Sequence, residues 1–346
     1  MAEITVLVTC AASLVVPSTL QALQQNASVA YRFVGVDASP EPLAGEYLAD
    51  FYLVPRADET GYVKSVLEVV KQSNAQLLLV LSDAEALVLS EPAIRSQLEA
   101  VGCQVLLPAQ EIVNCCVDKG LFMAFLQQDP NTAVPYQLID HAPQLSASAA
   151  LLEYPAKAFI VKPRRGCGSR GVMLIDATAN PAELLLSRHY RRFTLDFVEQ
   201  TLHERMDLDL LAMPWYGGKD YNIDVLCQAG QVVYSLVQQR VSPVMGAIMT
   251  AQIVDEEDIN ALVSLLVRRL NVTGLINIEI ARCLQTGLPA VYEINPRPSA
   301  AFAFLAYQGV DILADVQAVY QSKQLASRRF GPMWIKRVWD QLYHAE

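Results

Sequence analysis

Two glutamates, an asparagine and an arginine near the C-terminal end have a spacing that suits metal and phosphate chemistry. Glu279 lies in the segment NIEIA, and Glu293, Asn295 and Arg297 lie in YEINPRP. Alternate residues of a strand face the same side, so Glu293 and Asn295 project together, with Glu279 on the preceding strand of a predicted hairpin. Two carboxylates and an amide carbonyl form the all-oxygen ligand set that Mg²⁺ prefers. We therefore predict that Glu279, Glu293 and Asn295 bind Mg²⁺, with Mn²⁺ as an alternative.

A cross-strand salt-bridge patch is the alternative interpretation of these charges. Acids within a β segment that otherwise reads AVY are costly to bury without a metal or another partner, which favours the metal site. Arg297 stands two residues beyond Asn295, where its guanidinium could clamp a phosphoryl group during transfer.

A glycine-rich loop follows a predicted strand in the middle of the chain. The strand Ala158–Val161 leads through Lys162 into the segment RRGCGSRG. Glycines let the backbone approach a phosphate and turn its N–H groups inward, and a serine hydroxyl adds a donor. The predicted phosphate contacts are Gly166, Gly168, Ser169 and Gly171. A flexible hairpin tip is the alternative, and the loop is not a Walker A motif because no Lys-Ser/Thr pair follows its last glycine.

The segment LLAMPWYGGKD is typical of a strand that ends at an adenine site. Met213 can offer its backbone carbonyl and Trp215 its backbone N–H to the base, while Pro214 between them has no N–H. Asp220, just after a glycine turn, could accept hydrogen bonds from ribose hydroxyls. An ordinary apolar strand end is the alternative.

The N-terminal third alternates short apolar strands with helical patterns, which predicts a parallel sheet with both faces covered. The expected strands are Ile4–Cys10, Tyr31–Ser39, Ala75–Asp83 and Cys103–Pro108, with a helical pattern at Val63–Gln72. Ligands of such sheets bind at the carboxyl ends of the strands. The polar residues expected there, with helix capping as the alternative role, are Asp37, Ser82, Asp83 and Glu85. No glycine follows the first strand, so a dinucleotide site is not expected.

The C-terminal half reads as β hairpins interrupted by helices. The segments QAGQ and LQTGLP are predicted hairpin turns between apolar strands. Helices are expected at Asp118–Gln128, Asp255–Leu270 and in DILADVQAVYQSKQ. The fold class is therefore α/β, with mixed α+β character.

Composition limits the classes of partner. The chain has 346 residues, 53% of them hydrophobic and 18% charged, and a net charge of −10. The negative charge argues against nucleic-acid binding. Seven cysteines without CxxC spacing favour reduced thiols and a cytoplasmic location. No uninterrupted apolar segment is long enough for a membrane span, so no membrane partner is expected. The apolar N-terminal run is interpreted as a buried strand and a helix, because it begins with an acidic MAE.

In chain order, these segments resemble the ATP-grasp superfamily, and most closely its stand-alone enzymes that are similar to one half of the carbamoyl-phosphate synthase large subunit. VKPRRGCGSRGV resembles the phosphate-covering loop of the family, and YEINPRPS its metal-binding strand. MPWYGGKDYNIDVL resembles its hinge and nucleotide-contacting acid. VDKGLFMAFL resembles its lysine helix, which places Lys119 on the nucleotide. The resemblance runs from Ile4 to about Asp340.

This resemblance implies an ATP-grasp fold in three parts. An N-terminal parallel-sheet pre-ATP-grasp domain is expected at residues 1–112. A central region with the small lid lobe is expected at 113–205. A C-terminal antiparallel-sheet lobe with the hinge, metal site and substrate site is expected at 206–346. The glycine loop would be a mobile lid, in which Cys167 is predicted to be a small filler and not a nucleophile.

The resemblance also implies a reaction. ATP would phosphorylate a small carboxylate, and an amine would then attack the acyl phosphate to give an amide or peptide bond, ADP and phosphate. Lys119 and Lys162 would hold ATP and its phosphates. Arg297 and Arg240, the latter in VQQRVS, would stabilise the transferring charge. The partners would be a carboxylate and an amine, and a homodimer is left open.

Two alternatives remain at this point. One is a kinase-like enzyme that releases an acyl or carbamoyl phosphate, and the other is a regulatory protein that binds nucleotide without turnover. The apolar segment PSAAFAFLAYQG after Arg297 departs from the carbamoyl-phosphate synthases and puts bicarbonate in doubt as a substrate. Arg164 and Arg165 make the loop more basic than phosphate binding requires, and the sequence does not assign their role.

Overall fold

The computed structural model describes residues 3–166, 168–180, 182, 191–205, 207–244 and 247–337. The chain forms two compact units. The first unit combines Met1–Val113, Asp220–Ile280 and Ile294–Glu346, and the second combines Asn114–Lys219 and Ala281–Glu293. The three-domain division expected from the sequence remains a prediction.

The first unit contains a five-stranded parallel sheet of order β3-β2-β1-β4-β5. Its strands are β1 (Glu3–Val8), β2 (Ala30–Asp37), β3 (Asp50–Leu53), β4 (Leu77–Leu79) and β5 (Gln104–Val105). The four strands predicted from the sequence are all present. The edge strand β3 was not predicted, because its sequence DFYL is short and only half-buried, with no apolar alternation.

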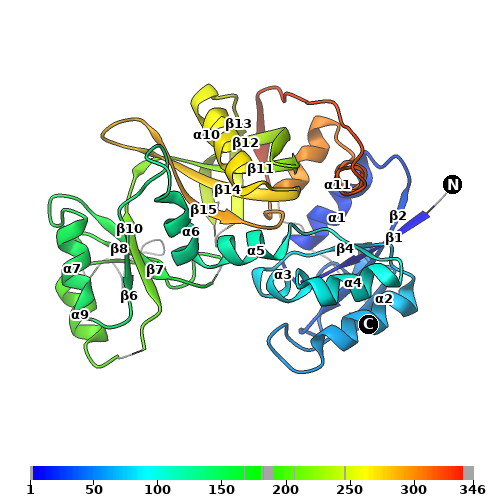
Figure 1. The fold of residues 1–346 in the computed structure, drawn as a ribbon, viewed down its shortest axis with the longest axis horizontal. Coiled ribbons are helices and arrows are strands. Elements are labelled where there is room, and N and C mark those ends of the chain that lie inside the picture. The colour runs from blue at the N-terminus through cyan, green and yellow to red at the C-terminus, as the bar shows by residue number, and fades with distance from the viewer. Residues whose placement is uncertain are drawn as a thin grey trace. The chain divides into compact units, whose positions relative to one another are not determined.

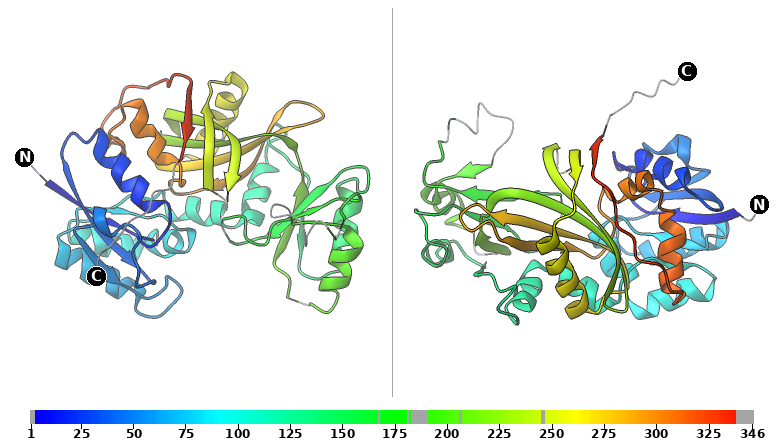
Figure 2. Two further views of the ribbon diagram at one scale, coloured as in Figure 1. Left: turned by 180° about the vertical axis from the view of Figure 1, so that it is seen from behind. Right: turned by 90° about the horizontal axis from the view of Figure 1, so that it is seen from above.

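Helices cover both faces of this sheet, as the alternation of elements predicted (Figures 1 and 2). α2 and α4 pack together on one face, and α1 packs against η2 on the other. The helices of this region are α1 (Val16–Gln25), η1 (Gly45–Tyr47), α2 (Tyr62–Ser73), α3 (Asp83–Leu89), α4 (Pro92–Ala100) and α5 (Gln110–Val117).

The second half of the chain forms a six-stranded sheet of order β15-β14-β11-β12-β13-β16. Its strands are β11 (Gly217–Gln228), β12 (Gln231–Val244), β13 (Ala247–Ile253), β14 (Gly274–Cys283), β15 (Pro289–Asn295) and β16 (Met333–Lys336). β11 and β12 are antiparallel, and both residues of their turn, Ala229 and Gly230, have positive φ angles of 47° and 75°. This is the tight hairpin that QAGQ predicted.

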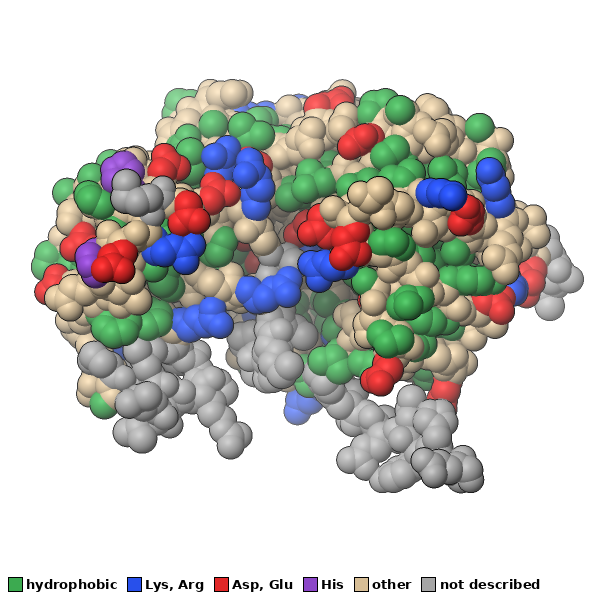
Figure 3. Space-filling view, turned by 90° about the horizontal axis from the view of Figure 1, so that it is seen from below, with side chains coloured by type: hydrophobic (Ala, Val, Ile, Leu, Met, Phe, Trp, Pro, Cys, Tyr) green, Lys and Arg blue, Asp and Glu red, His purple; other side chains and the backbone are tan. Residues whose placement is uncertain are grey.

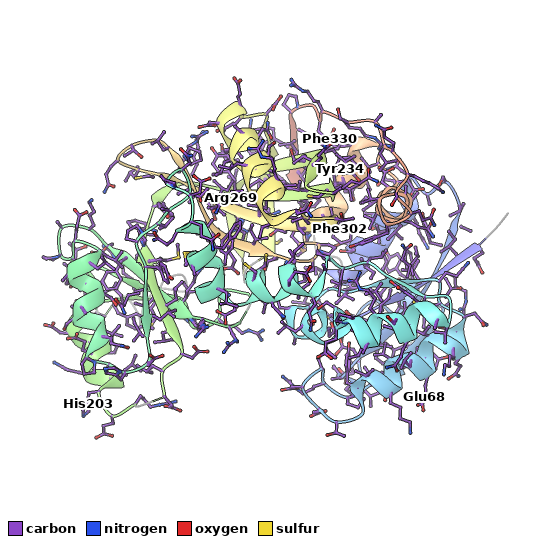
Figure 4. The ribbon with its side chains drawn as sticks, in the orientation of Figure 1. Glu68, His203, Tyr234, Arg269, Phe302 and Phe330 are labelled. Atoms are coloured by element: carbon purple, nitrogen blue, oxygen red, sulfur yellow. The ribbon has the colours of Figure 1, made fainter. Side chains whose placement is uncertain are left out.

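The apolar segment after Arg297 belongs to the main core of the first unit. It forms η2 (Phe302–Gln308), in which Phe302 to Ala306 are buried. The helices α10 (Glu257–Leu270) and α11 (Ile312–Tyr320) also belong to the first unit. Tyr234 and Phe330 meet edge to face in the same core, with ring centroids 5.6 Å apart (Figure 4). Packing therefore explains why this segment is mostly apolar.

The second unit is built on a mixed sheet of order β6-β10-β7-β8-β9. Its strands are β6 (Gln137–Ile139), β7 (Phe159–Pro163), β8 (Met173–Ile175), β9 (Arg192–Phe193) and β10 (Leu210–Pro214). α7 (Gln144–Leu151) and α9 (Leu195–Leu202) lie side by side against it and close a core of their own (Figure 1). Another helix of the second unit, α6 (Lys119–Leu126), begins one residue after Asp118.

Together these elements confirm the α/β fold class, with one parallel, one mixed and one antiparallel sheet. Among the described residues, no single helix has the length and hydropathy of a membrane span, and one bent pair, Phe302–Gln308 with Ile312–Tyr320, meets these criteria only jointly. Lys and Arg side chains are interspersed with Asp and Glu on the face shown in Figure 3.

Candidate active site

The glycine loop leaves the end of β7 with a backbone that requires its glycines. Gly166, Gly168 and Gly171 have φ angles of 136°, 67° and 75°, and Ser169 between them has 57°. A Cβ at Gly171 would stand 2.7 Å from the ring of Pro163, so a larger residue would collide there. These left-handed conformations turn successive peptide groups, the geometry expected of a loop that covers phosphate. Cys167 lies outside the described residues.

Two lysines from distant parts of the sequence meet one glutamate in the second unit. Lys162 Nζ on β7 lies 3.1 Å from Glu293 Oε2, and Lys119 Nζ at the start of α6 lies 3.7 Å from Glu293 Oε1. Lys119 also donates to the carbonyl of Gly166, at 2.7 Å. Lys162 donates to the carbonyl of Tyr292, at 3.3 Å. The structure thus brings together both predicted nucleotide lysines, a predicted metal ligand and the glycine loop.

This cluster is nearly closed to solvent. Lys119 is 6% and Lys162 4% exposed. Within the group of three side chains, two ammonium groups share one carboxylate, which leaves an excess positive charge at a buried position. Burial of an uncompensated charge is costly, and an anion placed among these groups would relieve that cost.

The two arginines that follow Pro163 contact acids of the same unit. Arg164 Nε and Arg165 Nη2 each lie 2.7 Å from an oxygen of Asp118, and Arg165 also lies 3.3 Å from Asp209. Asp118 caps α6 by accepting from the N–H groups of Gly120 and Leu121. The carboxylate of Asp118 therefore joins the base of the glycine loop to the helix that carries Lys119.

The pKa of Asp118 reflects these contacts. Burial opposes its ionisation, but the hydrogen bonds from Arg164 and from the N–H of Leu121 outweigh burial and hold the pKa of this carboxyl below its ordinary value. The contact is therefore a charged one at neutral pH.

The predicted hinge occupies the end of β10. Met213 is buried and pairs with Ile160 of β7, whereas the Trp215 side chain is 46% exposed. A Cβ on Gly218 would stand 2.3 Å from the carbonyl oxygen of Arg282, so this glycine permits a close approach of two backbones. The adenine contacts assigned to Met213 and Trp215 remain predictions.

A second charged cluster lies in the first unit, around Arg240 of β12. Its guanidinium lies 2.9 Å from Asp220 and 3.0 Å from Glu279, and it donates to the side-chain carbonyl of Asn222 at 3.3 Å. Asp220 was predicted to contact ribose and Glu279 to bind metal, so the structure brings three predicted site residues together.

Asn295 joins the same cluster from β15. Its amide nitrogen donates to Glu279 at 3.2 Å and to the side-chain carbonyl of Asn277 at 3.0 Å. Arg297, in contrast, pairs with Asp83 at 2.7 Å, at the start of α3 and the carboxyl end of β4. Helix capping, the alternative role for these strand-end residues, is found at Ser82, whose hydroxyl accepts from the N–H of Glu85.

The donor atoms suit Mg²⁺, although the described residues contain no group of three His, Cys, Asp or Glu side chains arranged to hold a metal. The predicted ligands are two carboxylates and one amide, and all three offer oxygen. Because the amide nitrogen of Asn295 is engaged by Asn277 and Glu279, its carbonyl oxygen is the atom left for a ligand.

Sequence reasoning missed three polar residues that support these clusters. Asp118 precedes the predicted lysine, Asn277 lies two positions before Glu279 on one face of β14, and Asp224 stands in the apolar run YNIDVL. The period of two could have indicated Asn277, and the cost of burying an acid could have indicated Asp224.

Comparison with known proteins identifies the fold. Residues 207–331 match the family model for an ATP-grasp in the biosynthetic pathway with Ter operon. No curated protein matches the sequence. The structure is similar to N5-carboxyaminoimidazole synthetase from Staphylococcus aureus complexed with ADP, at a TM-score of 0.67 and 13% identity over 97% of this chain and 82% of that one.

Two further solved structures have the same fold. The biotin carboxylase–β-γ-ATP complex from Campylobacter jejuni has a TM-score of 0.64 and 14% identity, over 93% of this chain and 72% of that one. The L-amino acid ligase from Bacillus licheniformis has a TM-score of 0.60 and 15% identity, over 92% and 73%. The resemblance to the ATP-grasp superfamily, predicted from the sequence, is confirmed.

Proposed function

We propose that this chain, which has the ATP-grasp fold, is an ATP- and Mg²⁺-dependent carboxylate–amine ligase that acts on an amino acid or a related small acid. The observation that carries the proposal is the buried pair Lys119 and Lys162 around the single carboxylate of Glu293. A nucleotide phosphate would offset the excess positive charge of this cluster, and the adjoining glycine loop would supply backbone N–H donors for the same anion.

The proposed reaction has two steps. A carboxylate oxygen of the substrate attacks the γ-phosphorus of ATP, the bond to the β,γ-bridging oxygen breaks, and ADP leaves. The amine then attacks the acyl carbon and loses a proton, and inorganic phosphate leaves as the amide forms. This chemistry needs positioning and charge neutralisation from the protein, and no covalent nucleophile.

The residues of the two clusters would divide these tasks. Lys119 and Lys162 would hold phosphate oxygens, and Arg240 and Arg297 would stabilise the negative charge on the transferring group and on the acyl phosphate. Bound Mg²⁺ would neutralise the β- and γ-phosphates. The residues proposed to hold the ion are Glu279, Glu293 and Asn295.

The remaining predicted contacts serve the rest of the nucleotide. Gly166, Gly168, Ser169 and Gly171 would cover the phosphates. Met213 and Trp215 would bind the adenine through their backbones, and Asp220 would accept from the ribose. The relatives with this fold include a synthetase complexed with ADP and an amino acid ligase, which supports the proposed class of reaction. The cytoplasm and a homodimer remain predictions from the sequence.

A screen of amino acids in pairs, with ATP and Mg²⁺, tests this function. We expect ADP release only when an acid and an amine are both present, with mass analysis showing a product that has lost one water. Stoichiometric acyl phosphate without any amine would instead support the kinase-like alternative. Nucleotide binding without turnover across a broad panel would support the regulatory one.

A further inference from the structure

A completely buried carboxylate, Asp224 of β11, lies at the centre of a polar network in the first unit. Its oxygens accept from Gln238 at 2.8 Å, from the hydroxyl of Ser299 at 3.0 Å and from Asn222 at 3.2 Å. They also accept from the backbone N–H of Ser299 at 3.3 Å and from Asn277 at 3.4 Å. The carboxylate is thus surrounded by donors from several separate segments of the chain.

Two of these donors lead outward to the proposed site. Asn222 gives its amide nitrogen to Asp224, and its carbonyl accepts from Arg240. Asn277 likewise gives its amide nitrogen to Asp224, and its carbonyl accepts from the amide nitrogen of Asn295. Each link passes from a carboxylate through one side-chain amide to a residue of the proposed site.

The direction of these links follows from the chemistry of their groups. An ionised carboxylate only accepts hydrogen bonds, whereas an asparagine amide has a donating and an accepting end. Asp224 and the backbone carbonyl of Ile223, which accepts from the same Asn277 nitrogen at 3.2 Å, therefore together fix which end of Asn277 faces inward. Asn277 in turn accepts from the nitrogen of Asn295, which leaves the Asn295 carbonyl oxygen for a ligand. A side chain at position 224 with a donor of its own would face the donors of the network and so weaken this order, leaving the Ile223 carbonyl as the acceptor for Asn277.

Burying the carboxylate of Asp224 costs folding free energy, and the nearness of the network to the proposed site gives a reason for this cost. The hydrogen-bond partners described for Asp224 are all neutral, and burial raises the pKa of this carboxyl to about 6, although hydrogen bonds from Ser299, Gln238 and Asn222 favour the ionised form. Buried acids without a cationic partner are rare because they oppose folding. A role in orienting site residues gives a reason for retaining one here.

We propose that Asp224 is a positioning residue, which orients Asn295 and Arg240 through the amides of Asn277 and Asn222 and so presents the Asn295 carbonyl to the metal. The inference rests on the proposed function, because it assumes that this cluster binds a metal–nucleotide complex. It assigns to Asp224 an effect on metal-dependent binding without direct contact with the ligand.

Calorimetric titration of ADP, with excess Mg²⁺ and with EDTA, tests the proposal without a known substrate. We expect wild type to bind ADP at least tenfold more tightly with Mg²⁺. Asp224→Asn should lose at least fivefold of this metal-dependent gain and keep its metal-free ADP affinity within twofold. Asn277→Ala, which leaves Asp224 in place but cuts the link to Asn295, should lose a similar part of the gain. The double variant should lose no more than either single one.

Asp315→Asn is the matched control, because Asp315 is a buried acid of the same unit that pairs with Arg328, at 3.3 Å, and not with this network. It should retain the full metal-dependent gain. If wild type gains affinity with Mg²⁺ and both Asp224→Asn and Asn277→Ala gain equally, the positioning role is wrong while the proposed function stands. If wild type binds ADP in neither condition, both are wrong.

Discussion

At the scale of single residues, the carboxylate of Glu293 compensates the charges of two buried lysines in the second unit. Its carboxylate lies 3.1 Å from Lys162 and 3.7 Å from Lys119, and both ammonium groups are almost completely buried. Loss of one partner from a buried ion pair costs about 3–5 kcal/mol, because the remaining charge stays buried without compensation. A phosphate can take the place of that partner, so the effect of losing the carboxylate should depend on nucleotide.

We therefore predict that Glu293→Gln lowers the free energy of unfolding of the nucleotide-free protein by about 3 kcal/mol. Added ADP should raise its melting temperature by more than it raises that of wild type, since the phosphate supplies the missing negative charge. Thermal unfolding with and without ADP measures both effects. Glu68→Gln, which removes an exposed carboxylate that lies 3.8 Å from Lys64, should change neither. Equal ADP-induced shifts in Glu293→Gln and wild type would contradict the interpretation.

Single-residue reasoning from the sequence used the cost of burying a charge, and the metal-binding role that it assigned stays a prediction. Glu279, Glu293 and Asn295 were predicted because acids inside an apolar strand need a partner. The same argument applied to Asp224 would have indicated the buried network. The partners themselves could not be predicted, because Lys162 and Glu293 are brought together only by the folded chain.

At the scale of elements, periodicity and capping residues predicted several of the helices and strands, whereas the helices α3, α4, α5, α7 and α9 were not predicted. Asp118 and Asp311 cap the helices that the sequence placed after them, and the acid-first, arginine-last pattern marks α10. The strand before the glycine loop extends to Pro163, so Lys162 is held by the sheet and not by the loop. The short edge strand β3 gave no signal, because only sheet pairing with β2 defines it.

The ion pairs of Asp118 with Arg164 and Arg165 connect α6 to the glycine loop, and they lead to a prediction at this scale. Asp118→Asn keeps a residue type that caps helices well but removes the charge that holds Arg164 and Arg165. We expect trypsin to cleave this variant several-fold faster than wild type at the arginines of the loop, with helix content unchanged.

Mass analysis of the fragments measures the cleavage rate at each site. Asp209→Asn removes the second acid near Arg165 but leaves Asp118 in place, so it should have a smaller effect. If Asp118→Asn and wild type are cleaved at the same rate, the ion pairs of Asp118 do not restrain the loop.

At the scale of the whole molecule, the resemblance found in four short segments was enough to predict the fold class and the ATP-grasp fold. Neither compact unit is a continuous stretch of the chain: the first combines three segments and the second two. The division into three parts that the resemblance implied is linear along the chain, and it remains a prediction.

The substrate could not be predicted for a different reason. Lysines and glycines that suit a nucleotide have a recognisable spacing, whereas a small acid is recognised by side chains drawn from unrelated segments. Arg297 and Asp83 are an example of residues that the sequence does not connect, since they lie 2.7 Å apart in the structure but more than 200 positions apart in the chain.

The central claim is that a substrate carboxylate is phosphorylated by ATP before an amine attacks it. Amino acids labelled with ¹⁸O in their carboxyl groups, supplied in pairs with ATP and Mg²⁺, test it most directly by mass analysis of the phosphate released. The acyl phosphate route predicts one ¹⁸O atom in each phosphate formed, because the attacking carboxylate oxygen leaves with phosphorus. Unlabelled phosphate released together with an amide product, or AMP in place of ADP, would contradict the account.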